Sequence, residues 1–176
     1  MQKNKGDYQL WPFVRMPNGT YSVPDRLLYP IYMSLVNDGK LDKVFYDEPT
    51  LSFDSFIEYL KNPANHVVFV IDKKQNNFVL IAWLNGLRRT FAYSHFTSIG
   101  EKNYKTVIGK LVLDYWTGLQ PKMKIIGITP ETYTAANKVA RKIGYKPIGT
   151  IPGICYMAKD KKLIGGVIAY FEKGGQ

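Results

Sequence analysis

The chain has 176 residues, of which 45% are hydrophobic and 14% aromatic, and it carries a formal net charge of +10. This length and apolar content fit one globular domain spanning residues 1–176 and exclude a disordered chain. Its one cysteine and two histidines exclude an internal disulfide and leave little material for a metal centre, so we expect no metal. No apolar run approaches the ~20 residues of a membrane helix and the N-terminus is polar, so we expect a cytoplasmic protein without a membrane partner.

The positive charge is confined to one half of the chain. Residues 1–86 hold 9 basic and 9 acidic side chains, whereas residues 87–176 hold 15 basic and 5 acidic ones. A basic half favours an anionic partner, either a nucleic acid or a phosphorylated small molecule, although a lysine-rich solvated surface would give the same count. No helix-turn-helix, zinc-finger or RNP-type pattern is present, so nucleic-acid binding is the least favoured of these interpretations.

The first part of the chain is predicted to form one strand and then helices. Turn residues separate a strand over 8–16, a helix over about 25–38 and a second helix over 53–61. Pro24 fits the first turn of the first helix, and Gly39 fits its end. Pro30 lies inside this helix and predicts a break or a kink, and a break would give two short helices. Ser52 is the expected N-cap of the second helix.

The remainder of the chain predicts a sheet interrupted by two helices. β-Branched and aromatic runs predict strands over 66–72, 78–85, 87–99, 123–128, 148–158 and 163–171, and helical spacing predicts helices over 104–119 and 130–143. This order predicts an α/β (α+β) fold, with a mixed, mostly antiparallel central sheet and helices on both faces. Because a helical crossover joins them, the strands around His95 and Ile126 are expected to pair in parallel.

The segment Thr134–Tyr145 carries a characteristic pattern, in which Asn137 is followed by small and apolar residues and the run ends in Arg-Lys-Ile-Gly-Tyr. Together with the element order from Val67 to Phe171, this run resembles the GNAT N-acetyltransferase superfamily. The resemblance implies a sheet that splays open between its fourth and fifth strands, with acetyl-coenzyme A in the gap. In that family the pyrophosphate lies on backbone amides at the start of the following helix, where free N–H groups and the helix dipole hold its charge.

The phosphate loop of the family usually reads Arg/Gln-x-x-Gly-x-Gly/Ala, and the corresponding residues here are Tyr104 to Gly109. Gly109 fits the pattern, whereas Tyr104 and Val107 depart from it. The resemblance implies cofactor-binding residues in the fourth strand, in this loop and in the helix after the fifth strand. They are Phe96, Thr97, Ser98, Tyr104, Lys105, Thr106, Val107, Ile108, Gly109, Lys110 and Asn137.

Three residues are candidates for proton transfer. The tyrosine with which many family members protonate the departing thiolate falls on Ala140 here, so Tyr133 and Tyr156 are the candidate acids. His95 lies in the fourth strand, where the family often has a general base, and strand alternation puts it on the same face as Tyr93. A histidine held by a hydrogen bond for structural reasons alone is the alternative interpretation.

The leading hypothesis is an N-acyltransferase that moves an acetyl group from a coenzyme A thioester to an amine acceptor. The alternative is a protein that keeps the fold without the chemistry and serves binding or assembly, with a protein partner or as a homo-oligomer. Short proteins of this kind occur among bacteriophage and prophage products, including virion proteins, and the lysine- and tyrosine-rich composition resembles them. Cys155 has no nearby base in the sequence and is expected to be a buried apolar residue.

Overall fold

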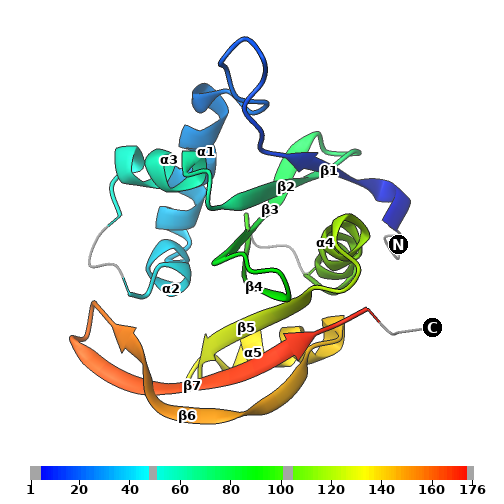
Figure 1. Cartoon of the computed structure of the whole chain (residues 1–176). Helices are drawn as coiled ribbons and strands as arrows, with labels where there is room; N and C mark the ends of the chain where they lie inside the picture. The colour runs from blue at the N-terminus through cyan, green and yellow to red at the C-terminus, as the bar shows by residue number, and fades with distance from the viewer. Residues whose placement is uncertain (1–4, 48–50, 101–104, 174–176) are drawn as a thin grey trace.

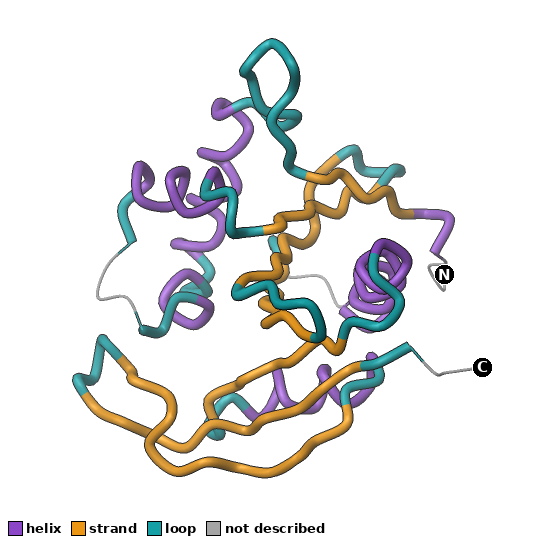
Figure 2. Tube along the Cα trace, viewed as in Figure 1, coloured by secondary structure: helices purple, strands orange, loops and turns teal. Residues whose placement is uncertain are grey.

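The computed structural model describes residues 5–47, 51–100 and 105–173, which form a seven-stranded sheet flanked by helices (Figure 1). The strands are β1 (Tyr8–Pro12), β2 (His66–Asp72), β3 (Asn77–Asn85), β4 (Phe91–Ser98), β5 (Lys124–Pro130), β6 (Lys146–Met157) and β7 (Lys162–Phe171). The helices are a 3-10 turn (Lys5–Asp7), α1 (Asp25–Asn37), α2 (Leu41–Val44), α3 (Phe53–Lys61), α4 (Lys105–Leu119) and α5 (Thr134–Ile143). Figure 2 shows how strands and helices succeed one another along the chain.

The strand order across the sheet is β1-β2-β3-β4-β5-β7-β6. All neighbouring strands are antiparallel except β4 and β5, which are parallel and are joined through α4. Their paired residues run from Phe91–Lys124 to Tyr93–Ile126. The structure therefore confirms the mixed, mostly antiparallel sheet and the parallel pairing expected between the strands of His95 and Ile126.

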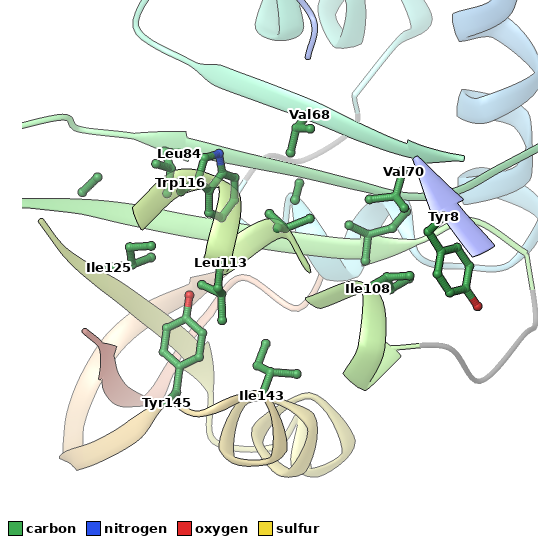
Figure 3. Close-up of a cluster of buried hydrophobic side chains, with 14 of the residues drawn as sticks. Tyr8, Val68, Val70, Leu84, Ile108, Leu113, Trp116, Ile125, Ile143 and Tyr145 are labelled. Atoms are coloured by element: carbon green, nitrogen blue, oxygen red, sulfur yellow. The ribbon is translucent and has the colours of Figure 1, made fainter. Parts of the chain in front are cut away.

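Helices cover both faces of the sheet around β2 and β3. Figure 1 shows α1, α2 and α3 on one side of these strands and α4 on the other. One buried cluster, on the α1–α3 side, includes Phe56, Phe69, Ile81 and Trp83. The other, on the α4 side, includes Val68, Val70, Leu84, Ile108, Leu113 and Trp116 (Figure 3). Since both faces are buried, β2 and β3 are continuous apolar runs and do not alternate with polar residues.

The N-terminal helices differ in part from expectation. The predicted break at Pro30 is wrong, because α1 continues through it as one helix. Leu28, Ile31 and Leu35 are buried on one face of α1, and this packing outweighs the single N–H donor that a proline removes. The four-residue α2 is too short to give a periodic signal. The helix over 53–61 is confirmed, and the Ser52 side chain accepts a hydrogen bond from the Ser55 N–H, 3.2 Å away.

Several strand and helix ends also differ. β1 ends at Pro12 and not at residue 16, because the Pro12 carbonyl accepts a hydrogen bond from the Ser22 hydroxyl (2.7 Å) as the chain turns away. β4 begins at Phe91 and not at residue 87, after a turn in which Gly86 has a φ of +57°. α5 begins at Thr134 and not at residue 130, because residue 130 still belongs to β5 and pairs with β7. Among the described helices, none has the length and apolar character needed to span a membrane.

Candidate functional site

A cleft opens where β4 and β5 part. The two strands pair over only three residues, ending at Tyr93 and Ile126, and then diverge around a cavity of about 560 Å³. Residues 94–98 of β4 form one wall, and residues 127–130 of β5 together with much of α5 form the other. The element order of the sheet thus produces the splay that the family resemblance implies between the fourth and fifth strands.

The backbone of β4 presents hydrogen-bonding groups to this cleft. The Ile99 N–H donates to the Val79 carbonyl (3.0 Å), and the Thr90 carbonyl accepts from the Lys124 N–H (2.9 Å). Because backbone groups alternate in direction along a strand, odd-numbered residues bond β3 and even-numbered residues face β5. The N–H and C=O groups of Phe96 and Ser98 therefore point to the side where β5 has already turned away. A ligand in the cleft meets an extended strand edge with both donors and acceptors.

The cleft reaches both faces of the sheet. Trp83 lies directly across from His95 in the β3–β4 register, and its ring stacks on both His95 (5.0 Å between centroids) and Phe45 (5.2 Å). This stack places the segment that follows α2 beside His95 on the α1–α3 face. The neighbouring Phe96 points to the opposite face and contacts Trp116 of α4 (5.4 Å). The lining therefore includes residues from both faces of the sheet.

His95 is held in a defined orientation by its neighbours. Its Nε2 lies 3.3 Å from Oδ1 of Asn85. The Asn85 amide and the Trp83 indole N–H both donate to the Tyr59 hydroxyl, at 3.3 and 2.8 Å. Since Oδ1 can only accept, the His95 Nε2 is the donor, and the neutral ring carries its lone pair on Nδ1. Burial lowers the pKa of His95 to about 4, and the Asp47 carboxylate offsets part of that effect. The imidazole is therefore neutral at pH 7.

Two tyrosines reach the cleft close to His95. Tyr133 and Tyr46 both line it, and their rings meet edge to face with centroids 6.5 Å apart. Burial is the main cause that raises the pKa of each hydroxyl above its usual value, so both keep their protons at neutral pH. Tyr156 lies elsewhere: it is 44% exposed on the outer strand β6 and is not among the residues that line the cleft. Of the two predicted acids, Tyr133 and not Tyr156 is in the described lining that also includes His95.

A buried hydrogen-bonded pair fixes the point where the strands separate. The Ser94 hydroxyl donates to the Ile126 carbonyl (3.2 Å), so the Tyr145 hydroxyl donates to Ser94 Oγ, 2.6 Å away. Burial raises the pKa of Tyr145 well above its usual range, which keeps this donor protonated. The pair ties β4, β5 and the segment after α5 together at the cleft, which both residues line.

The predicted cofactor residues divide into three groups. Phe96, Thr97, Ser98, Gly109 and Asn137 line the cleft. Lys105, Thr106, Val107, Ile108 and Lys110 belong to the first turns of α4, whereas Tyr104 lies outside the described residues. Gly109 is a helix residue, and a Cβ added to it would lie 3.0 Å from the Ile143 side chain. This close approach shows that Gly109 permits tight packing of α4 against α5, and its predicted role in a phosphate loop stays a prediction.

Asn137 and Ala140 belong to the wall that α5 contributes. The Asn137 amide donates to the Pro130 carbonyl (3.4 Å) and so anchors the start of the helix to the end of β5. Ala140 lines the cleft at the position where the resemblance leads one to expect a tyrosine. The alanine leaves the space of a tyrosine side chain open. Three tyrosines stand in the described lining, and the Tyr145 hydroxyl is already bonded to Ser94, so the hydroxyls of Tyr46 and Tyr133 are the ones that can replace the missing phenol.

The charged residues of the described lining are all basic. They are Lys40, Lys43 and Arg141, and no aspartate or glutamate stands among the described residues of the wall. Lys40 is engaged, because its Nζ donates to Asp38 and to the Gly100 carbonyl, both at 2.7 Å. Within the described ranges, no group of three or more His, Cys, Asp or Glu side chains could hold a metal. Cys155 is buried as expected, and its thiol lies behind Tyr46 (3.9 Å from Sγ to the hydroxyl).

Sequence reasoning missed several of these residues. Lys43 and Tyr46 come from the short segment around α2, where neither spacing nor a motif marks a functional position. Asn85 and Tyr59 orient His95 from separate elements, and only the packed fold brings them together. The Gly-Tyr that ends the predicted helix motif was a usable signal for Tyr145, but the sequence does not reveal its contact with Ser94.

Comparisons with known proteins identify the fold. No protein-family model and no curated protein sequence matches the chain. A solved spermidine N-acetyltransferase from Vibrio cholerae, in complex with CoA and spermine, is 15% identical with a TM-score of 0.72, and the match covers 94% of this chain and 95% of that one. A GNAT-family acetyltransferase from Bacillus anthracis is 12% identical, with a TM-score of 0.72 and coverage of 94% and 95%.

A third match extends the same likeness. The ribosomal-protein-S5-alanine acetyltransferase from Vibrio fischeri is 11% identical, with a TM-score of 0.67, and the match covers 94% of this chain and 93% of that one. At these identities the likeness establishes the fold alone. The predicted GNAT-like architecture is thereby confirmed across nearly the whole described chain.

Proposed function

We propose that the chain is an N-acyltransferase that transfers an acetyl group from acetyl-coenzyme A to an amine. The observation that carries this proposal is the cleft between β4 and β5, which reaches both faces of the sheet and exposes the backbone of Phe96 and Ser98. A cleft lined from both faces of the sheet offers two substrates a place to meet inside the protein. The likeness of the fold to acetyltransferases, one of them in complex with CoA and spermine, supports the same assignment.

The residues present fit a coenzyme A thioester. Its long arm combines apolar and amide groups, and the cleft offers the matching surfaces: the apolar side chains of Phe96, Val139 and Val167 beside the β4 backbone. Thr97, Ser98 and Asn137 add polar side chains. The free N–H groups of the first turn of α4 and its helix dipole would hold the phosphates, with Lys110 nearby on the same helix.

Acetyl-coenzyme A supplies an activated acyl carbonyl, and transfer to an amine forms a C–N bond while the C–S bond breaks. His95 is the proposed base: its Nδ1 lone pair accepts the proton that the amine loses, while Asn85 holds the other nitrogen. Tyr133, or Tyr46 beside it, is the proposed acid, because both hydroxyls stay protonated and line the same cleft. That proton goes to the departing sulfur, which leaves as a thiol.

A binding or assembly protein without catalysis is the second candidate, and two positions favour it. Val107 stands where the family loop has a glycine, and Ala140 stands where it often has a tyrosine. A protein of this kind would keep the cleft and its ligand but would not release an acetylated product.

Calorimetry and a transfer assay separate these functions. We expect acetyl-coenzyme A to bind, and to bind more weakly at higher salt, because backbone amides and lysines would hold its phosphates. We expect H95Q to reduce acetyl transfer to a panel of amines by ~10²–10⁴-fold, the usual contribution of a positioned base. The matched control is H66Q, since His66 is exposed at the start of β2. Binding without product in the wild-type protein would favour the second candidate, and no binding at millimolar ligand would contradict both.

A further inference from the structure

The charge of the cleft restricts what the acceptor can be. Its described lining holds Lys40, Lys43 and Arg141 and no carboxylate. Lys40 is neutralised by Asp38, whereas Lys43 and Arg141 make no ion pair with any described residue. Two cations without described partners therefore face a cleft whose described lining contains no acidic side chain.

The two cations lie on opposite sides of the sheet. Arg141 follows Ala140 on α5, the helix that packs against α4 through Ile143 and Gly109. Lys43 belongs to α2, two residues before Phe45, and Phe45 stacks on Trp83, which in turn stacks on His95. Lys43 is therefore the cation on the face that His95 occupies, where the proposed base must meet the amine.

We propose that the amine acceptor also carries an anionic group, a carboxylate or a phosphate, and that Lys43 binds it while the amine reaches His95. This inference rests on the proposed function and names its substrate class. An anion entering the cleft gains an opposite charge at Lys43, whereas a second or third ammonium would be partly desolvated without a partner. The acceptor class thus differs from the polyamines named for the Vibrio cholerae enzyme of the same fold.

One carboxylate affects His95 although it is not among the residues that line the cleft. Asp47 is exposed, follows Tyr46 directly, and is the charge that raises the pKa of His95 against the effect of burial. Asp42 and Asp160 lie near Tyr133, and they pair with Lys159 (3.7 Å) and Lys162 (3.4 Å). Of these three described carboxylates, Asp47 is the one without an ion pair to a described residue, and it matches an acceptor with one ammonium group. Lys43 matches an anionic group on the same molecule.

Matched acceptors test the charge preference directly. Tyrosine and tyramine differ by one carboxylate, phosphoethanolamine and ethanolamine differ by one phosphate, and spermidine represents the polyamines. We would measure binding of each by calorimetry, to the full chain with and without coenzyme A. We expect the anionic member of at least one pair to bind about fivefold more tightly, the value of one partly exposed ion pair, and the pair that responds identifies the anionic group.

Variants assign the preference to one side chain. K43Q should abolish the preference for the anionic member, whereas K138Q, on the exposed surface of α5 and outside the described lining, should keep it. Three results would each overturn the inference. Spermidine could bind at least as tightly as the anionic acceptors, or K43Q could keep the preference for the anionic member. The third is that no acceptor binds at millimolar concentration. Failure of the proposed function is seen separately, as an absence of acetylated product whatever the order of the binding constants.

Discussion

The two halves of the sheet are built differently. β2 and β3 are buried almost end to end between α1–α3 and α4, whereas β6 begins with nine consecutive exposed residues. α5 is the helix drawn against β5 and β7 in Figure 1, and the Ile126, Ile128 and Ile168 side chains stay partly exposed. In the first, closed half, helices cover both faces of the sheet and bury a cluster on each face. In the second, open half, the sheet packs against one helix.

The cleft lies at the junction of these halves, and each half contributes a different component. The closed half supplies His95 and the β4 backbone, which the stack on Trp83 and the pairing with β3 hold in place. The open half supplies α5 and Tyr133. The net charge divides at a different point, because residues 1–86 are neutral and residues 87–176, which include β4 and α4 of the closed half, carry the whole net charge of +10.

The largest expected difference between the halves is in stability. Phe69 is fully buried in β2 and packs against Phe13 and Phe78, so F69A should lower the free energy of unfolding by about 3–5 kcal/mol. Ile148 on β6 is 67% exposed, and I148A should change it by no more than about 0.5 kcal/mol. Urea unfolding of both variants measures the contrast. Similar losses would show that β6 is covered in solution and that the comparison of the halves is wrong.

A smaller effect concerns the pH dependence of stability. The pKa of His95 is lowered to about 4 in the folded chain, so the unfolded chain takes up the proton first as the pH falls below about 6.5. Stability linked to His95 is therefore fully present above that pH and is lost towards pH 4. Between pH 7 and 4.5 we expect the wild-type protein to lose about 1–2 kcal/mol more than H95Q. Parallel curves for the two proteins would show that the histidine is not desolvated.

The smallest effect is at the junction itself. Y145F removes the hydroxyl that donates to Ser94, while Ser94 keeps its bond to the Ile126 carbonyl, so the expected cost is about 1 kcal/mol. For a chain of this size, that lowers Tm by about 2–4 °C. Y156F is the matched control, since Tyr156 is 44% exposed and should leave Tm unchanged. An equal Tm shift in both variants would show that the Tyr145 hydroxyl does not stabilise the junction.

Much of the fold could be predicted because local signals agreed with tertiary structure. The apolar runs of β2 and β3, the Ser52 cap and the Gly144 stop each marked an element that the structure contains. Pro30 gave a wrong prediction because its free-energy cost to the helix is smaller than the stabilisation from the packing of the surrounding helix residues. The face on which His95 lies was also predictable, since alternation along a strand depends only on residue number.

The site was less predictable because its groups come from distant segments. A glycine that permits helix packing and a glycine that admits a phosphate look alike in sequence, so the close packing of α4 on α5 at Gly109 was not predictable. Tyr156 and Tyr133 were equally plausible acids until the strand order put one outside the cleft. Lys43 and Tyr46 lie at the cleft because the neighbouring Phe45 stacks on Trp83, and no local sequence pattern predicts that contact. The link to phage products stays a prediction.

The central claim is that the edge of β4 in the cleft binds the coenzyme A thioester. Amide NMR with hydrogen exchange tests it residue by residue as acetyl-coenzyme A is added. The account predicts that the Phe96 and Ser98 amides shift and exchange at least ~10-fold more slowly, because a ligand replaces water at the strand edge. The Ile99 amide, already bonded to Val79, should keep its rate. Unchanged Phe96 and Ser98 amides at saturating ligand, or the largest shifts on β6, would contradict the account.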